Sequence, residues 1–242
     1  MFRGSRTITP ILLVAFGVFR PVAAAQNSPQ PHPSEATRLH SISSASARLS
    51  QISAFEQYVA YWTTEPGWRT ELQLRNNLES SALTVVPAVR TADGTETALP
   101  AVTIKSGDVV SLDLADALLK TAPQLVGSYG SLVLRYSANV HRALYAVAMI
   151  RVDGQPIVFH LDAEFHTASP TRASREGIWW LPRESVTDFL ILANSSDRQL
   201  DTGLTLYDSA GKAWRQELSL GPRQTQRLSV RSLLQRSGLG GS

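Results

Sequence analysis

The sequence predicts an all-β protein in which two related antiparallel β-sandwich modules follow one another, the second smaller than the first. The first observation behind this prediction is that apolar and polar side chains alternate from Tyr58 onward. A period of two buries every second side chain, as a sheet with one covered face requires. The second is that turn-forming pairs separate these runs at hairpin spacing. The third is that the pattern occurs twice along the chain.

Each strand is predicted from its own alternation. The clearest strands expected in the first half are Glu71–Arg75, Val110–Leu114, Ser131–Tyr136, Ala143–Arg151 and Gln155–Phe165. The expected turns are Asn76-Asn77, Asp93-Gly94, Ser106-Gly107, Asp153-Gly154, Ala210-Gly211 and Gly221-Pro222. Asp113 is placed to cap a short helix over residues 115–120. Many short strands with turns about every 8–12 residues favour a sandwich, with a barrel as the main competitor.

An internal repeat is the most informative feature of the sequence. The pair Tyr61-Trp62 recurs as Trp179-Trp180, an offset of 118 residues. The same offset matches Leu72 with Leu190, Leu74 with Leu192, Asn76 with Asn194 and Glu79 with Asp197. The offset then becomes 117 for Leu83, Val89 and Gly94, and 116 for Val102, Ile104, Leu112, Leu114 and Leu118. Each slip is expected in or beside a turn, where a deletion disturbs no strand register, so we interpret the repeat as a duplication.

The two copies are unequal in length. Three strand-like runs follow the first copy, whereas only a short tail follows the second. A unit of about 60 residues in four or five strands is marginal alone. The second copy must therefore pack on the first, present an exposed edge, or be completed by another chain. The expected organisation is a leader at 1–25, a flexible tether at 26–53, module 1 at 54–166, a linker at 167–176, module 2 at 177–236 and a disordered tail at 237–242.

The first 25 residues have the pattern of a cleaved signal peptide. Arg3 and Arg6 precede the apolar run Ile8–Phe19, and Ala23-Ala24-Ala25 then offers a cleavage site before Gln26. As a helix the apolar run would be about 18 Å long, short of the roughly 30 Å of a bilayer core. We therefore expect a secreted or periplasmic protein, with no stable membrane insertion of the mature chain.

Composition removes several classes of function. The formal charge of the whole chain is +3, but three of its 23 basic residues lie in the leader, which leaves 20 basic against 20 acidic residues. A neutral mature chain predicts no nucleic-acid partner. The chain has no cysteine, which excludes disulfides, thiol catalysis and cysteine-ligated metals.

One resemblance can be named on the repeated motifs. They are the aromatic pair Tyr61-Trp62, the strand and turn Leu72–Asn77, the turn Ala92-Asp93-Gly94 and the strand and helix Leu112–Leu119, with their second-copy equivalents. This layout resembles the immunoglobulin/fibronectin-like β-sandwich repeat modules of uncharacterised exported bacterial proteins. The resemblance implies a spacer, adhesive or assembly role and identifies no ligand.

The best candidate for chemistry is the segment Phe159–His166. As one strand it places His160, Asp162, Glu164 and His166 on a single face, and all four residue types can bind a divalent metal. Neighbours on that face lie about 6.6 Å apart and the two histidines about 20 Å apart, so at most two could share one ion. We therefore interpret this face as the charged, solvent-facing side of an edge strand and expect no metal site.

No motif indicates an enzyme or a bound cofactor. The segment Gly127–Ser131 lacks the spacing of a nucleophile elbow, and no phosphate-binding glycine loop occurs. Carboxylate pairs such as Asp113 with Asp116, or Asp162 with Glu164, are explained by helix capping and strand solvation. The sequence therefore predicts no catalytic, cofactor-binding or metal-binding residue.

Aromatic residues leave a second function open. Of each adjacent pair, one ring is expected in the core and its neighbour at the surface or a module interface. Exposed rings could instead stack on sugars; the candidates are Trp62, Trp68, Trp179 and Trp180. The favoured hypothesis is a non-catalytic exported binding or assembly module that acts through sheet edges and exposed aromatics, with a protein partner or self-association. A carbohydrate-binding module and, behind it, a metal-dependent hydrolase are the alternatives.

Overall fold

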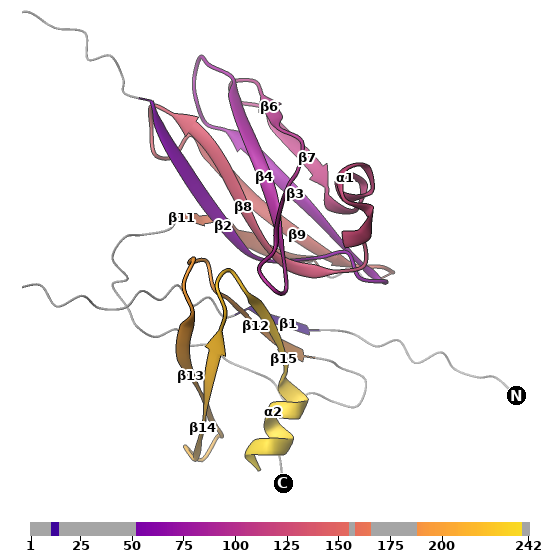
Figure 1. Cartoon of the computed structure of the whole chain (residues 1–242), viewed down its shortest axis with the longest axis vertical. Coiled ribbons are helices and arrows are strands. Elements are labelled where there is room, and N and C mark those ends of the chain that lie inside the picture. Colours follow the sequence, from indigo (N-terminus) through magenta and orange to yellow (C-terminus); the bar gives the residue numbers. More distant parts are fainter. Residues whose placement is uncertain (1–10, 15–51, 155–157, 166–187, 239–242) are drawn as a thin grey trace, which may run out of the picture.

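The protein is all-β, with its strands in several antiparallel sheets and two short helices. The computed structural model describes residues 11–14, 52–154, 158–165 and 188–238 (Figure 1). The predicted linker, nearly all of the tether and the last four residues lie outside these ranges. So does the second aromatic pair, Trp179-Trp180.

Two facing sheets form the first module. One sheet has the order β10 (Val158–Asp162), β9 (Leu144–Val152), β3 (Trp68–Asn76) and β7 (Val109–Asp113). The other runs β11 (Glu164–Phe165), β2 (Ser53–Thr63), β8 (Tyr129–Ala138), β4 (Leu83–Thr91) and β5 (Glu96–Ala98), with β6 (Val102–Ile104) also on β4. Two sheets with separate strand orders make a sandwich, as the alternation predicts.

The predicted alternation sets the core of this sandwich. Leu72 and Leu74 of β3 are fully buried, whereas Arg69 and Arg75 of the same strand are exposed. Residues from both sheets form one continuous apolar cluster; among them are Val59, Trp62, Val85, Leu132, Leu134, Ala148 and Ile150. The first module thus has a complete core between its own sheets.

The helix predicted after Asp113 is confirmed. Helix α1 spans Leu114–Thr121, and the Asp113 carboxylate accepts a hydrogen bond from the Asp116 N–H at 3.0 Å. A 3₁₀ turn, η1, follows at Pro123–Leu125. Burial of Leu114 and Leu118 ties this helix to the sandwich.

From residue 188 onward, the described part of the second module has the same order of strands and helix as β3 to α1 of the first. It contains β12 (Asp188–Ala193), β13 (Leu200–Tyr207), β14 (Ala213–Leu220), β15 (Thr225–Ser229) and α2 (Val230–Ser237). Strands β12 and β15 pair antiparallel, as do β13 and β14. On its other side β12 pairs in parallel with β1 (Ile11–Val14), four residues of the predicted leader.

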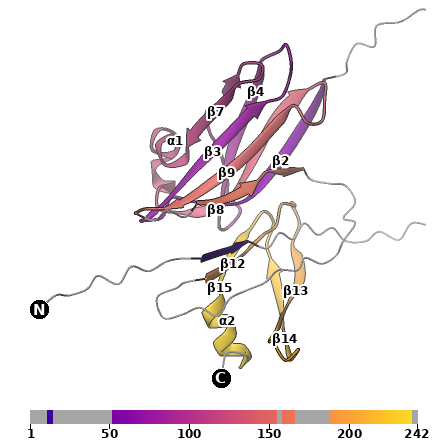
Figure 2. The same ribbon diagram turned by 180° about the vertical axis from the view of Figure 1, so that it is seen from behind.

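Strand β12 lies between the two modules and serves both. Leu190 and Leu192 face the small core of the second module, which also holds Leu206 and Leu233. Ile191, fully buried, belongs to the core cluster of the first module. Figures 1 and 2 show the second module against the β2–β8 side of the first, where β12 contacts β2 and β15 contacts β8. The two modules are therefore in direct contact.

Candidate functional site

The paired strands of the two modules share one register. In the first module Glu71 of β3 lies opposite Asp113 of β7. In the second, Phe189 of β12 lies opposite Ser229 of β15, at offsets of 118 and 116 residues. The same offsets relate every pair along these two ladders. Equal registers mean that equivalent residues of the two modules can be compared one by one.

A buried asparagine pins the same loop in both modules. Asn76 donates through Nδ2 to the carbonyls of Ser81 at 2.8 Å and Ile104 at 3.0 Å, and its Oδ1 accepts from the Leu78 N–H. Asn194 bonds in the same pattern, to the carbonyls of Arg198 and Gly221 and the N–H of Ser196. Both side chains are about 98% buried or more, at 0% and 2% exposure. The loop between the first two strands of each copy is thus built alike.

The second hairpin turn is also repeated. Gly94 and Gly211 have φ angles of 91° and 79°, in the region that glycine adopts without strain. Each donates its N–H three residues back, to Thr91 at 2.9 Å and to Asp208 at 3.0 Å. The slip from an offset of 117 to 116, expected beside a turn, falls instead between β5 and β6. In the first module Pro100 divides the edge strand into β5 and β6, whereas the equivalent strand of the second module, β14, is continuous.

The modules differ at their outer strand edges. In the first module β8 pairs with β4 over the seven residues Val85–Thr91, and β9 pairs with all of β3. Within the described ranges, no strand pairs with the equivalent edge of β13. The equivalent edge of β12 carries only the four residues of β1. Among the described residues, the second module therefore has no counterpart of the β8–β9 hairpin that closes the first.

The backbone of β13 shows which groups this open edge presents. Asp208, just after β13, donates its N–H to the Lys212 carbonyl on the β14 side. Because N–H and C=O directions alternate along an antiparallel strand, every second residue of β13 then points its backbone away from β14. These residues are Asp201, Gly203, Thr205 and Tyr207. Their side chains lie on the outer face of the sheet, where Tyr207 is 60% exposed.

The missing hairpin leaves the inner face of β13 partly uncovered. Leu83 and Val85 of β4 are 1% and 0% exposed, but their equivalents Leu200 and Thr202 are only half-buried. Leu204, further along the same face, is half-buried as well. A strand added at this edge would cover apolar surface as well as satisfy backbone groups.

Arg227 of β15 anchors the junction between the modules. Its guanidinium donates to both carboxylate oxygens of Glu65 and, at 3.1 Å, to the Tyr61 hydroxyl. It also lies 4.4 Å from the ring centroid of Tyr129 and 4.8 Å from that of Phe189. Burial by itself would lower the pKa of Arg227, but Glu65 and Tyr61 outweigh burial and raise it. Arg227 and Glu65 thus form a partly buried ion pair, called the clamp below.

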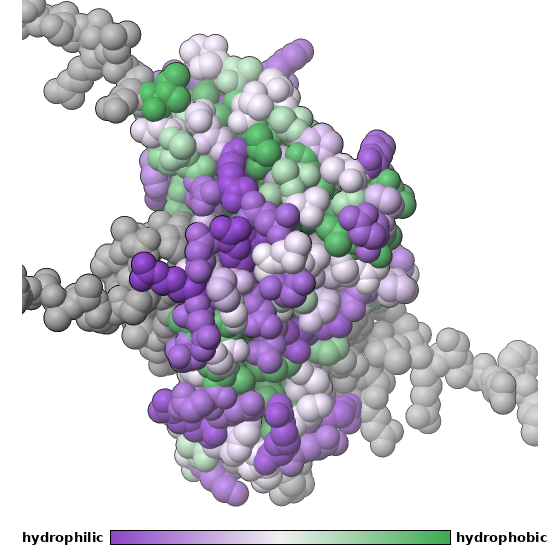
Figure 3. Space-filling view, in the orientation of Figure 1, coloured by the Kyte–Doolittle hydropathy of each residue, from purple (hydrophilic) through white to green (hydrophobic). Residues whose placement is uncertain are grey.

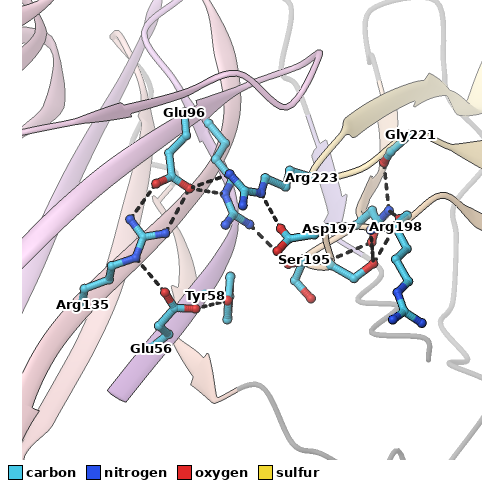
Figure 4. Close-up of polar contacts among 12 residues, drawn as sticks. Glu56, Tyr58, Glu96, Arg135, Ser195, Asp197, Arg198, Gly221 and Arg223 are labelled. Carbon is cyan, nitrogen blue, oxygen red and sulfur yellow. Dashed lines mark hydrogen bonds and ion pairs between the residues drawn. The ribbon is translucent and has the colours of Figure 1, made fainter. Parts of the chain in front are cut away.

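A second polar cluster joins side chains of β2, β4, β5 and β8 in the first module (Figure 4). Glu96 accepts from Arg90 at 2.9 Å and from Arg135 at 2.6 Å, and Arg135 also donates to Glu56 at 2.7 Å. Hydrogen bonds from Arg135, then from Arg90, lower the pKa of Glu96 to about 2 against the opposing effect of burial. Glu96 is therefore ionised over the whole physiological pH range.

Two loops of the second module meet this cluster: Arg90 donates to the Ser195 carbonyl at 3.4 Å, and the turn at Arg223 lies beside Glu96. Arg223 lies 3.8 Å from Glu96 and donates to Asp197 at 2.5 Å. The Thr225 N–H donates to the Ala92 carbonyl at 3.0 Å, so the backbones of the two modules touch directly. A side chain at Gly94 would collide with the Pro222 carbonyl. Hydrophilic residues cover this junction on the face shown in Figure 3.

The candidate metal ligands do not gather. Glu164 does not continue the strand of His160 and Asp162: the strand breaks at Ala163, so that β10 pairs with β9 and β11 pairs with β2 of the opposite sheet. The single strand expected over Gln155–Phe165 is therefore wrong, because the chain crosses from one sheet to the other. His160, Asp162 and Glu164 are exposed, and the described residues hold no group of three metal-binding side chains. His166 lies outside these residues.

The aromatic candidates have structural positions. Trp62 is 0% exposed, and its indole N–H donates to the Ser131 carbonyl at 2.9 Å. Tyr61 is 2% exposed and faces the junction, where it meets Arg227. Trp68 is half-buried against Phe159, at 6.5 Å between ring centroids. The segment Gly127–Ser131 forms a turn and the start of β8, where the Ser128 hydroxyl donates to the Leu125 carbonyl.

Sequence reasoning did not find the junction residues Arg227, Glu65 and Glu96. Arg227 and Glu65 are 162 positions apart, so no local pattern links them. One signal was present in the repeat itself. The copies match on the inner face of β12, but on its outer face Phe189 and Ile191 replace Glu71 and Gln73. An outer face that turns apolar in one copy indicates a covered surface.

Comparisons with known proteins add little. No protein-family model matches the chain, and neither does any curated protein. The crystal structure of Thermotoga maritima 1070 is similar to part of it at 10% identity and a TM-score of 0.36, covering 48% of this chain and 97% of that one. That likeness is too slight to carry an argument. In the described ranges, no helix is both long enough and apolar enough to span a membrane.

Proposed function

We propose that this protein is an exported, non-catalytic binding or assembly module whose second half binds a partner by β-strand addition. The observation that carries the proposal is the open edge of β13, whose counterpart in the first module is paired with β8 over seven residues. Main-chain hydrogen bonds supply the affinity in this mode, and alternate side chains supply specificity.

We also propose that the two modules arose by duplication and that the mature chain is exported. The equal registers, the equivalent asparagines and the repeated turn support an internal duplication in which the described part of the second copy has no closing hairpin. The predicted leader supports secretion or a periplasmic location for the mature chain from Gln26. Immunoglobulin-like ancestry stays a prediction from the repeated motifs.

The junction supports the same function by holding the open edge in place. Arg227 and Glu65 clamp the second module on the first, and the contact from Thr225 to Ala92 fixes the angle between them. Strand addition needs an edge that is ordered before the partner arrives, because ordering the edge on binding would reduce the affinity. The first module thus serves as the scaffold for the second.

The carbohydrate-binding alternative has less support. A sugar platform needs an exposed ring face, and Trp62 is fully buried. Trp68 is half-buried against Phe159. Trp179 and Trp180 lie outside the described residues, so they support neither the carbohydrate-binding hypothesis nor the strand-addition hypothesis.

Amide exchange tests the proposal at the edge itself. In the isotope-labelled mature chain, the amides of Asp201, Gly203, Thr205 and Tyr207 should exchange freely at low concentration. They should become protected in concentrated protein or in an extract of the cell envelope of the source organism. Thr205→Pro removes an edge N–H without breaking a bond to β14, so it should abolish the protection.

Glu217→Pro is the matched control. Glu217 lies on β14 opposite Gly203 with its backbone pointing to the other side of the hairpin. Its side chain makes only an exposed ion pair with Arg215, so this variant should keep the protection of β13. If the four amides exchange freely in both conditions, the strand-addition proposal is wrong.

A further inference from the structure

We propose that the open edge of β13 pairs with β13 of a second copy of this chain, antiparallel about a two-fold axis at Leu204. This inference rests on the proposed strand addition and names its partner. The result would be a four-stranded sheet in the order β14-β13-β13-β14 across the dimer. Four features of the hairpin support it: backbone direction, side-chain pattern, charge and the position of the first module.

The backbone groups match in one register. With the axis at Leu204, Asp201 lies opposite Tyr207 of the second copy, and Gly203 lies opposite Thr205. All four residues point their N–H and C=O groups to the open edge, so each pair can exchange two hydrogen bonds. The ladder would then span seven residues, the length of the β4–β8 ladder in the first module.

The side chains match on the inner face as well. The two-fold axis sets Leu204 against Leu204 of the second copy, and Leu206 against Thr202. Leu204 is half-buried in one copy, and pairing would cover it. In the first module β8 covers the equivalent position by placing Leu134 opposite Pro87. A second copy thus offers the apolar neighbour that this edge lacks.

Charge distinguishes this edge from the other edge of the same hairpin. Proteins protect free edges with charged residues or proline, and the outer edge of β14 carries Arg215 and Glu217, both exposed. The open edge of β13 has Asp201 as its one charged residue and no proline, although the Arg215 guanidinium reaches from β14 over Gly203. In the two-fold register Asp201 meets Tyr207, so no like charges oppose each other.

The first module does not obstruct this pairing. Figure 1 shows the β13–β14 hairpin pointing away from the first module, with its tight turn at the far end. The contact from Arg90 to the Ser195 carbonyl lies at the near end, before β13 begins. An antiparallel pair therefore places the two first modules at opposite ends of the joined sheet.

Substitutions of Tyr207 by residues of opposite charge test the register, because they should change the dissociation constant of the dimer in opposite directions. Tyr207→Asp would set two carboxylates opposite each other at both ends of the ladder, whereas Tyr207→Lys would set a cation opposite Asp201 twice. One strand pair buries less than the about 1,200 Å² of a standard interface, so we expect a dimer with a micromolar dissociation constant. Sedimentation of the mature chain over a concentration series should show the constant rising about fivefold for Asp and falling about fivefold for Lys.

Tyr207 is exposed, so neither change should alter the fold, which circular dichroism checks. The absence of native cysteine permits a second test. Asp201→Cys and Tyr207→Cys would lie about 5.5 Å apart between Cα atoms, within the roughly 4.4–6.8 Å that a disulfide spans. Oxidation should link the two variants when they are mixed and leave each one unlinked alone.

The outcomes separate the self-pairing from the proposed function. Cross-linking in the mixture alone, with opposite shifts for Tyr207→Asp and Tyr207→Lys, supports the dimer. A monomer at all concentrations whose β13 amides are protected only in envelope extract overturns the dimer and keeps strand addition to another protein. A monomer whose amides are never protected overturns both.

Discussion

Strands β3 and β12 occupy equivalent positions in the two modules, but their outer faces lie in different surroundings. Both strands turn leucines inward at equivalent positions, Leu72 with Leu190 and Leu74 with Leu192. Their outer faces differ: β3 presents half-buried polar side chains, whereas β12 presents Phe189 and the fully buried Ile191. Register and turns are thus shared, and only the covered face has changed.

The apolar outer face of β12 shows where the second module obtains its stability. Its own core has few fully buried residues, among them Leu190, Leu206 and Leu233. The face that lies on the first module adds Ile191 to the larger core, and the Arg227–Glu65 clamp closes the same surface. An incomplete sandwich can therefore stay folded, with an edge left open, because its other face is covered.

The largest effect is expected from moving the outer-face residue of one copy into the other. Ile191→Gln places at this position the residue that the first copy has there. An amide would be buried between the modules without partners, and the free energy of unfolding should fall by about 3 to 4 kcal/mol. Urea unfolding followed by total tryptophan fluorescence measures the change, because both modules contain tryptophan.

The reciprocal variant is the control. Gln73→Ile places an apolar side chain on a half-buried strand position, where surface substitutions change stability by about 0.5 kcal/mol or less. Equal losses from the two variants would contradict the view that only the outer face of β12 is an interface.

A smaller loss is expected from the clamp. Arg227→Ala leaves the Glu65 carboxylate partly buried without its cation, with only the hydrogen bond from the Thr63 hydroxyl among those described, and removes the hydrogen bond to Tyr61. The pair is about a quarter exposed, with side-chain exposures of 22% and 25%, so we expect a loss of about 2 to 3 kcal/mol, below that of a fully buried pair. Faster hydrogen exchange in residues 188–237 than in 53–165 would locate the loss in the second module.

An exposed arginine provides the comparison for this variant. Arg215 pairs with Glu217 at side-chain exposures of 67% and 70%. Arg215→Ala should change stability by less than about 1 kcal/mol, as surface ion pairs do. A clamp that proved no more costly to remove than this surface pair would show that the modules are held by apolar contact alone.

Much of the fold followed from local pattern. Alternation located the strands, and Asp113 located the helix, because both signals depend on neighbours within a few residues. The registers of the paired strands agree with the predicted offsets, except that the second change of offset occurs at Pro100 within an edge strand. An edge strand can absorb an extra residue there because only one of its sides is paired.

Contacts between distant residues could not be predicted from the sequence. The break at Ala163 depends on β10 and β11 pairing with different sheets. The clamp depends on a contact between residues 162 positions apart. In the sequence, only the difference between the outer faces of β3 and β12 indicates this contact. That difference predicts that the outer face of β12 is covered, but not which residues cover it.

The smallest changes in stability are expected at the helix N-caps, where the two modules have different capping residues. Asp113 caps α1 through the Asp116 N–H at 3.0 Å, and Ser229 caps α2 through the Ser232 N–H at 3.4 Å. Removing either cap as alanine should cost about 1 kcal/mol. Asp113→Ala should cost slightly more than Ser229→Ala, because Asp113 also pairs with the exposed Arg69.

Exchanging the caps sharpens this comparison further. Asp113→Ser and Ser229→Asp keep a side-chain acceptor at the same position, so each should unfold within about 0.5 kcal/mol of the native chain. Urea midpoints of the four variants measure the differences. If Ser229→Asp were as damaging as Ser229→Ala, the two helix starts would not be equivalent, and the match between the modules would end at β15.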